Sequence, residues 1–337
     1  MNYTHFIGID VSKNWLDFTI MHESQVLKYD RIENSLSAIK DFFKGLKKVW
    51  AFRLENSLVC MEHTGIYNNH LLVYLTKLKA NICLESGMHI KQSSGLKRGK
   101  NDKVDSQRIA MYAYKNRDEI KLWEPKRDVL VGLKYLTTLR NRIITVLKQL
   151  KTPLKETISF VSKAEQKKIT DHCESSIAAL KNDLVRINKE IESIIMADDE
   201  LKRLFHLVSS VTGVGPVTAT EIIITTNEFK SINCNKKYAC YSGIAPFEHQ
   251  SGSSIRGKTR VSSMGNKNVK KLLHLAALSA SQAKGDLKLY YERKVLEGKN
   301  KMLILNAVRN KLIARVFACV KQNRLYERNY SNLLFNP

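Results

Sequence analysis

Four carboxylates in the first third of the chain have types and spacing suited to metal-assisted phosphodiester chemistry. Asp10 and Glu62 each end a short apolar run typical of a buried strand. Asp102 and Asp105 lie three residues apart and share one face of a predicted helix. Packed carboxylates repel one another unless cations lie between them, and oxygen ligands suit Mg²⁺, so we expect a site for Mg²⁺ or Mn²⁺. Two such ions would stabilise the attacking and leaving oxygens of a scissile phosphate.

Each acid taken alone could equally be a surface residue or a helix cap. Their order, with Asp on the first strand, Glu on a later strand and Asp on a helix, is that of ribonuclease H-like nucleases. The basic residues Lys97, Arg98 and Lys100 immediately precede the helical acids and would place phosphate-binding charge beside the metals. Together these features favour the metal site.

A serine-rich segment, residues 251–258, could supply a nucleophile. Its glycines permit close approach of a backbone, Arg256 and Lys258 could hold a phosphate, and the hydroxyl of Ser251 could attack phosphorus. The segment contains no histidine base, although His249 is close, and a metal ion could activate the hydroxyl instead. The alternative is a solvated turn.

The surrounding sequence is strongly basic. Residues 249–285 contain seven Lys or Arg and no Asp or Glu, which indicates either a solvated loop or a track for phosphates. The glycines favour the phosphate track. Besides Arg256 and Lys258, the residues expected to contact nucleic acid there are Arg260, Lys270 and Lys271.

A glycine turn separates two predicted helices at residues 213–216. The N–H groups of Gly213 and Gly215 could point at a phosphate, as in helix-hairpin-helix DNA-binding proteins. A plain helical corner explains the same residues.

The elements expected to position the four acids form a mixed sheet with helices packed on it. Alternating apolar residues predict an antiparallel meander, and the later segments alternate between helix and strand. The predicted strands are 6–10, 15–20, 26–32, 58–62 and 82–85, and the predicted helices are 35–50, 68–79 and 102–114.

Two heptad patterns follow. In the first, Val129, Leu136, Ile143 and Leu150 recur every seven residues, with Leu139 and Val146 between them, and Pro153 is expected to end the run. These helices are expected to form an antiparallel hairpin or an oligomerisation coiled coil. The second pattern comprises Ile177, Leu180, Leu184, Ile187, Ile191 and Ile194.

The composition points to nucleic acid. The 337 residues include 56 Lys or Arg against 32 Asp or Glu, a formal charge of +24, which favours a polyanionic partner. No apolar run approaches the roughly 20 residues of a membrane span, so we expect no membrane partner. The six cysteines include no CxxC pair, typical of reduced thiols in a cytoplasmic protein.

The sequence closely resembles the transposases of the insertion-sequence 110 family, which are bridge-RNA-guided serine recombinases. The matching motifs occur in the family's order and span most of the chain, apart from 126–200, which match only in helical character. They are residues 8–13 (GIDVSK), 62–67 (EHTGIY), 100–105 (KNDKVD), 213–215 (GVG), 242–246 (SGIAP) and 251–257 (SGSSIRG).

The resemblance implies a DEDD metal site formed by Asp10, Glu62, Asp102 and Asp105 in a RuvC-like domain, and a covalent phosphoserine at Ser251. It also implies a non-coding guide RNA that pairs with donor and target DNA, and dimers that form a tetramer in synapsis. We expect a nucleoid-associated bacterial protein. The expected parts are a ribonuclease H-like α/β domain (1–125), a helical coiled-coil connector (126–200) and a mainly helical transposase domain (201–337).

Two other functions fit parts of this pattern. In a metal-dependent junction resolvase or nuclease, water would be the nucleophile and the serine segment would only bind DNA. In a non-catalytic DNA- or RNA-binding scaffold, the positive charge alone would suffice. A covalent protein–DNA adduct excludes the first, and metal-dependent cleavage excludes the second.

Overall fold

The computed structural model describes the chain apart from residues 1–2, 48–51, 96–100, 252–254 and 328–337. The side chains of residues 94, 249–251, 255, 256 and 258 also lie outside the description. The chain divides into two compact units, Met1–Pro125 and Lys126–Pro337, which are described separately. None of the described helices is long and apolar enough to cross a bilayer.

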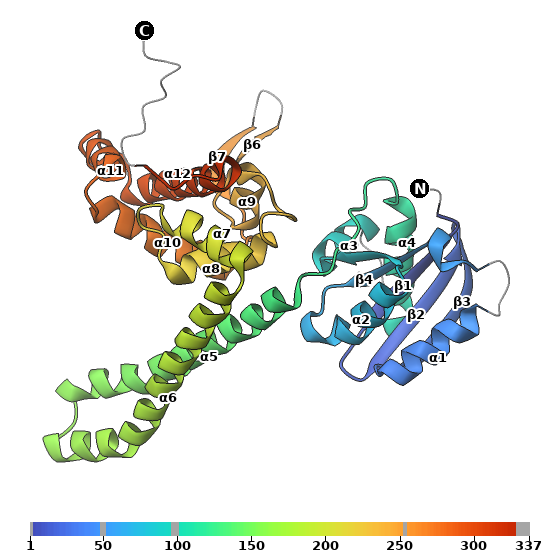
Figure 1. Ribbon diagram of the computed structural model, residues 1–337, viewed down its shortest axis with the longest axis horizontal. Helices are drawn as coiled ribbons and strands as arrows, with labels where there is room; N and C mark the ends of the chain where they lie inside the picture. Colours follow the sequence, from blue (N-terminus) through green and yellow to red (C-terminus); the bar gives the residue numbers. More distant parts are fainter. Residues whose placement is uncertain (1–2, 48–51, 96–100, 252–254, 328–337) are drawn as a thin grey trace, which may run out of the picture. The chain divides into compact units, whose positions relative to one another are not determined.

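The first unit contains a five-stranded mixed sheet in the order β3-β2-β1-β4-β5 (Figure 1). The first three strands form an antiparallel meander, and β4 and β5 run parallel to β1. The predicted strands and their mixed arrangement are therefore confirmed. The strands are β1 (His5–Val11), β2 (Trp15–His22), β3 (Gln25–Glu33), β4 (Ser57–Glu62) and β5 (Asn81–Glu85).

Helices cover both faces of this sheet because successive residues of a strand point to opposite sides. On one face, apolar residues of the strands pack against α1 (Leu36–Leu46) and α2 (Asn69–Lys77). On the other face, a smaller core packs against α3 (Gly87–Ser94) and α4 (Asp102–Lys115). The unit also contains the short 3₁₀ turns η1 (Leu54–Asn56) and η2 (Gly65–Asn68).

Helix α4 lies unusually close to the sheet at Gly8. A Cβ atom added to Gly8 would lie 2.2 Å from both the carbonyl oxygen of Ser106 and the backbone nitrogen of Ala110. Beside this contact, the hydroxyls of Thr19 and Ser106 are 2.8 Å apart and join β2 to α4. The side chain of Asn101 caps the helix by accepting a hydrogen bond from the N–H of Val104. The first turn of α4 is thereby held over β1 and β2.

The second unit is mainly helical, as predicted. A large apolar core joins its helices, and its strands form one two-stranded antiparallel hairpin. The elements are α5 (Asp128–Glu156), η3 (Thr157–Ser159), α6 (Lys163–Ala197), α7 (Asp199–Ser209), α8 (Pro216–Thr226), α9 (Asn235–Tyr241), β6 (Pro246–Ser251), β7 (Ile255–Val261), α10 (Lys267–Gln282), α11 (Asp286–Leu296) and α12 (Lys301–Gln322).

Helices α5 and α6 lie side by side in opposite directions, joined by a short turn (Figure 1). The antiparallel hairpin is thus present within one chain, whereas a coiled coil between chains stays a prediction. Leu139 and Val146 were expected in the seam, but they are 45% and 41% exposed, because α6 covers a different face of α5. Pro153 does not end α5, which continues to Glu156, since a proline in the last turn removes only one hydrogen bond.

A network of ion pairs around one buried carboxylate ties the start of α5 to two distant segments. The guanidinium of Arg127 donates to both carboxylate oxygens of Asp198 at 2.7 and 3.0 Å, and to Glu228 at 3.1 Å. The side chain of Glu228 is 0% exposed. Glu228 follows α8 in a turn where Asn227, Glu228 and Phe229 all have positive φ angles, of 51°, 57° and 62°. Arg127 therefore compensates a buried charge on a backbone turn that non-glycine residues rarely adopt.

We predict that Gly8→Ala separates α4 from the sheet. The added methyl group would overlap the backbone of α4, which cannot move as a flexible side chain could, so unfolding should become easier by about 1 to 3 kcal/mol. The free energy of unfolding in urea measures this. The matched control is Gly45→Ala in α1, where a Cβ meets no atom within 4 Å. That variant should gain about 0.5 to 1 kcal/mol because alanine favours a helix. Equal effects of the two substitutions would contradict the prediction.

Candidate functional site

The two strand acids among the predicted residues lie on the sheet face that α4 covers. Ile9 and Met61 are paired across β1 and β4 and belong to the core on the opposite face. Asp10 and Glu62 each follow one of these residues, so their side chains point toward the α4 face. Asp17 on β2 is the cross-strand partner of Asp10 and therefore points to the same face.

Helix α4 brings the other two acids to this face. Burial, which is the largest cause, and the nearby carboxylates of Asp105, Asp102, Asp17 and Glu62, in that order, together raise the pKa of Asp10 to about 6. The four predicted acids are therefore close enough to interact electrostatically, although they are separated by up to 95 positions in the sequence. The ionised form of a carboxylate in these surroundings is destabilised by the neighbouring negative charges unless cations lie between them.

Arginines engage the two helical acids. Arg108 Nη1 lies 2.9 Å from Asp105 Oδ1, one turn along the same helix. Arg31 Nη2 on β3 lies 3.1 Å from Asp102 Oδ2. Within the described residues, no three carboxylate, histidine or cysteine side chains gather closely enough to coordinate one metal ion as they stand. The donors are nevertheless all hard oxygens on one face, the ligand type that Mg²⁺ and Mn²⁺ take.

Close backbone approach also shapes the position of Glu62. A Cβ atom on Gly87, at the start of α3, would lie 2.0 Å from Glu62 Oε1. The glycine thus leaves room for the carboxylate beside α3. On β5, Glu85 is the cross-strand partner of Glu62 and is engaged by His89 at 3.0 Å and by the hydroxyl of Tyr112 at 3.2 Å.

Sequence reasoning missed three residues of this site, Asp17, Tyr29 and Arg31. The buried carboxylate of Asp17 accepts a hydrogen bond from the hydroxyl of Tyr29 at 2.5 Å, and Arg31 Nε lies 3.7 Å from it. This hydrogen bond, together with burial, raises the pKa of Tyr29 to about 12, so the hydroxyl remains a donor. The predicted meander could have revealed them, because its register pairs Asp17 with both Asp10 and Arg31.

The basic residues expected before α4 cannot be placed. Lys97, Arg98 and Lys100 lie outside the described residues. Their proximity to the acids stays a prediction from the sequence.

The predicted nucleophile lies in the second unit, at the end of a strand. Ser251 is the last residue of β6 and is paired with Ile255, the first residue of β7. β6 and β7 pair in antiparallel fashion, whereas residues 252–254 and the side chains of Ser251, Arg256 and Lys258 lie outside the description. Farther from the tip, Arg260 is exposed opposite Phe247. On α10, Lys271 is exposed and Lys270 is partly buried.

Packing accounts for one of the two glycines in the turn before α8. Gly213 has φ of +92°, and a Cβ there would lie 2.6 Å from the carbonyl oxygen of Ala276 and 2.7 Å from the Cβ of Ala280, both on α10. Gly215 is the N-cap of α8, and a Cβ there would meet no atom within 4 Å. The interpretation as a helical corner thus explains Gly213, whereas a phosphate contact stays a prediction for both.

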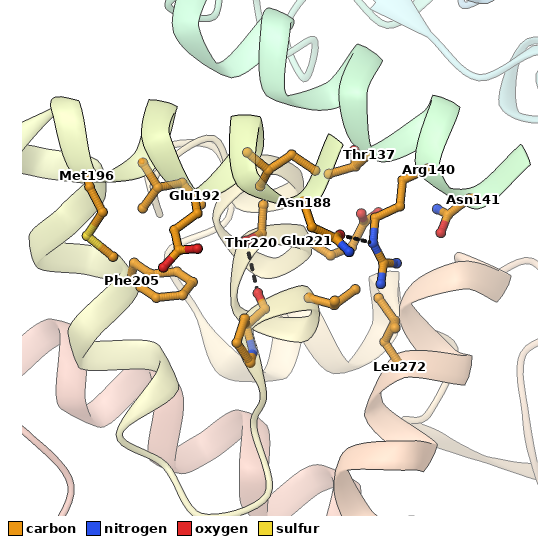
Figure 2. A pocket seen from close by; sticks show the side chains of 14 residues that line it. Thr137, Arg140, Asn141, Asn188, Glu192, Met196, Phe205, Thr220, Glu221 and Leu272 are labelled. Atoms are coloured by element: carbon orange, nitrogen blue, oxygen red, sulfur yellow. Dashed lines mark hydrogen bonds between the residues drawn. The ribbon is translucent and has the colours of Figure 1, made fainter. Parts of the chain in front are cut away.

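A cavity of about 370 Å³ lies elsewhere in the second unit, between α5, α6, α8 and α10 (Figure 2). Arg140 Nε donates to Asn188 Oδ1 at 2.7 Å beside it, and Glu221 lies near them. Burial raises the pKa of Glu221 and lowers that of Arg140, so both charged forms are poorly solvated. None of the predicted site residues lines this cavity.

Two protein-family models match the chain. Residues 7–162 match a transposase family model for DEDD enzymes of IS110 elements, and residues 205–292 match the model described as "Transposase IS116/IS110/IS902 family". The two matches do not overlap, and together they cover most of the chain. The chain belongs to the IS110 family of transposases. This IS110-family transposase is accordingly an enzyme of DNA recombination that binds DNA, and the DEDD family implies divalent metal ions.

Two relatives match the transposase over nearly its whole length, and a third matches less than half of it. The pilin gene-inverting proteins of Moraxella bovis and Moraxella lacunata are each 24% identical over 329 residues, covering 96% of this chain and 98% of theirs. The insertion element IS110 43.6 kDa protein of Streptomyces coelicolor is 27% identical over 154 residues, covering 45% of this chain and 38% of that protein.

Among solved structures, T. thermophilus RuvC in complex with a Holliday junction substrate has a TM-score of 0.28 and 16% identity. That match covers 36% of the transposase and 100% of the RuvC chain.

We predict that Asp10→Asn stabilises the transposase at pH 8 when a chelator is present. The pKa of Asp10 is raised from 3.8 to about 6 in the folded state. The folded protein is therefore most stable, with respect to this group, below about pH 4, where Asp10 is protonated, and it loses that stability as the pH rises through about 6. Asparagine resembles the protonated form at every pH. The gain should be about 2 kcal/mol at pH 8 and should vanish near pH 4.

Urea denaturation at several pH values tests this expectation. Asp41→Asn, at an exposed position of α1, is the control and should show no such pH-dependent gain. If Asp10→Asn were less stable than the unmodified protein at pH 8, the electrostatic account of the site would be wrong.

Proposed function

We propose that this transposase cleaves, exchanges and religates DNA strands with a divalent-metal site formed by Asp10, Glu62, Asp102 and Asp105. The observation that carries the proposal is the placement of the two strand acids on the sheet face that α4 covers, where burial and the neighbouring carboxylates raise the pKa of Asp10 to about 6. The sheet order and the position of α4 support a ribonuclease H-like, RuvC-like fold for residues 1–125. In such a fold the acids would face the scissile phosphate from one side of the sheet.

The four carboxylates would hold Mg²⁺, with Mn²⁺ as a substitute, because their oxygen donors suit both ions. When bound, the ions would stabilise negative charge on the attacking and leaving oxygens. The protein's own part is positioning: the cap at Asn101 fixes the first turn of α4, and Gly8 lets that turn approach Asp10. Asp105 is paired with Arg108, and Asp102 with Arg31.

We further propose that Ser251 is the nucleophile. Its Oγ would form a bond to phosphorus while a deoxyribose oxygen leaves with the serine proton, and the reverse reaction would join the new strands. The phosphoserine conserves the energy of the phosphodiester bond, so religation needs no ATP. Support comes from the family resemblance of residues 251–257 and from the position of Ser251 at the end of β6. Arg256 and Lys258 are assigned to hold the phosphate.

The proposed partners follow from the family resemblance and from the charge of +24. They are donor and target DNA, a non-coding guide RNA that pairs with both, and further copies of the chain, as a dimer and as a tetramer in synapsis. Residues 126–200 would connect the RuvC-like domain to the transposase domain, residues 201–337. The residues proposed to contact nucleic acid are Lys97, Arg98, Lys100, Gly213, Gly215, Arg256, Lys258, Arg260, Lys270 and Lys271.

We predict that Ser251→Ala binds DNA normally but forms no protein-linked DNA strand. Alanine lacks the oxygen that would bond to phosphorus, whereas the charges that bind phosphates remain. Labelled DNA is incubated with the protein, guide RNA and Mg²⁺, and denaturing electrophoresis before and after protease treatment measures the adduct. Ser253→Ala and Ser254→Ala are matched controls that should retain linkage.

Asp105→Asn separates the two halves of the proposed mechanism. It should bind DNA yet neither cleave nor form the adduct, because the site loses an anionic ligand. Cleavage without any adduct in the unmodified protein would instead indicate a nuclease that uses water. An adduct that persists in Ser251→Ala would remove Ser251 from the proposal.

We also predict that Arg260→Gln and Lys271→Gln each weaken DNA binding and make it less dependent on salt. Each lost phosphate contact should reduce the slope of log K against log salt concentration by about 0.9 on duplex DNA. Fluorescence anisotropy at several salt concentrations measures the slope. Lys44→Gln, on the exposed side of α1, is the control. Slopes identical to that of the control would remove these residues from the DNA-binding surface.

A further inference from the structure

We propose that Arg31 is a built-in counter-cation of the acidic site, which shares Asp102 with the metal ions and thereby sets how tightly the site binds them. Asp17 and Tyr29 hold Arg31 in that position. The inference rests on the proposed metal site and concerns residues outside the four carboxylates assigned to it.

The sheet register places Arg31 at the acidic site. Asp17 pairs with Asp10 on one side and with Arg31 on the other, so the three side chains form a row across β1, β2 and β3 on the α4 face. Asp102 lies above this row in the first turn of α4. Arg31 therefore joins the sheet to the helix, with Nε 3.7 Å from Asp17 Oδ2 and Nη2 3.1 Å from Asp102 Oδ2.

The partners of Arg31 differ in their freedom to move. The side chain of Asp17 is 3% exposed and is fixed by the hydroxyl of Tyr29, so it cannot turn away. The guanidinium also lies over the ring of Trp15, 5.4 Å from its centroid. By contrast, the side chain of Asp102 is 54% exposed and can rotate. Arg31 can thus release Asp102 while keeping its contacts with Asp17 and Trp15.

Charge balance gives Asp17 and Arg31 opposite effects on metal affinity. Arg31 brings a positive charge to the site and occupies an oxygen of Asp102, so it opposes divalent cations. Asp17 brings a negative charge next to Asp10 and favours them. At these separations, near the protein surface, one unit charge should change the affinity for a divalent ion on the order of tenfold.

Arg108 does not have the same arrangement. It pairs with Asp105 one turn away on the same helix, a local contact that does not depend on the sheet. Arg31 reaches Asp102 across 71 positions of sequence and only because α4 lies on the meander. Its position is therefore a property of the assembled site.

The test is Mn²⁺ binding by the full chain without nucleic acid, measured from the free-ion electron paramagnetic resonance signal. Arg31→Gln should bind Mn²⁺ about tenfold more tightly, Asp17→Asn about tenfold more weakly, and the double variant close to the unmodified protein. Arg31→Lys keeps the charge and should restore most of the lower affinity. Thermal melting in a chelator identifies any variant that does not fold.

Loss of structure alone would weaken binding in Arg31→Gln, so tighter binding distinguishes the counter-cation from a purely structural role. Unchanged or weaker binding in a folded Arg31→Gln would overturn the proposal. Asp10→Asn separates this result from failure of the metal site itself. If the unmodified protein binds Mn²⁺ no better than Asp10→Asn does, the proposed metal site fails; if binding depends on Asp10 but not on Arg31, only the counter-cation fails.

Discussion

The close approach of α4 to β1 is the contact on which the acidic site depends. Asp10 and Glu62 are placed by the strands, but Asp102 and Asp105 reach them only because Gly8 has no side chain between the helix and the sheet. The Thr19–Ser106 hydrogen bond fixes the helix along the sheet, and the Asn101 cap fixes where its first turn begins. A methyl group added at Gly8 would displace the carboxylates of Asp102 and Asp105 together by moving α4, although it would contact neither of them.

This contact concentrates negative charge that folding alone would not favour. The pKa of Asp10 is raised because its ionised form, which is both partly buried and surrounded by carboxylates, is destabilised in the folded protein. The arginines reduce the repulsion: Arg108 engages Asp105, and Arg31 engages Asp17 and Asp102. The proposed metal-binding role of Asp10 and the stability of the fold therefore oppose each other, which is typical of residues that serve chemistry.

Much of the first unit could be predicted from the sequence, because its strands and helices have clear periodicities and its acids end apolar runs. Asp17 was missed because an acid inside a strand resembles a solvent-facing residue until cross-strand register gives it partners. The predicted heptad seam of α5 was wrong at Leu139 and Val146, because a heptad pattern does not specify which face of the helix a neighbouring helix covers. The serine segment was predicted as a loop, since short strands around glycines have little periodic signal, and pairing of β6 with β7 is a tertiary property.

The ion pair between Arg127 and Glu228 has a consequence for the order in which the protein folds. The two residues are 101 positions apart, so their contact closes a long loop that contains the whole α5–α6 hairpin and α7. During synthesis, residues 1–125 emerge before either α8 or Glu228 exists. The sheet and α4 can therefore assemble while the second unit is incomplete, whereas burial of Glu228 must wait for a long-range encounter, the kind of step that slows folding.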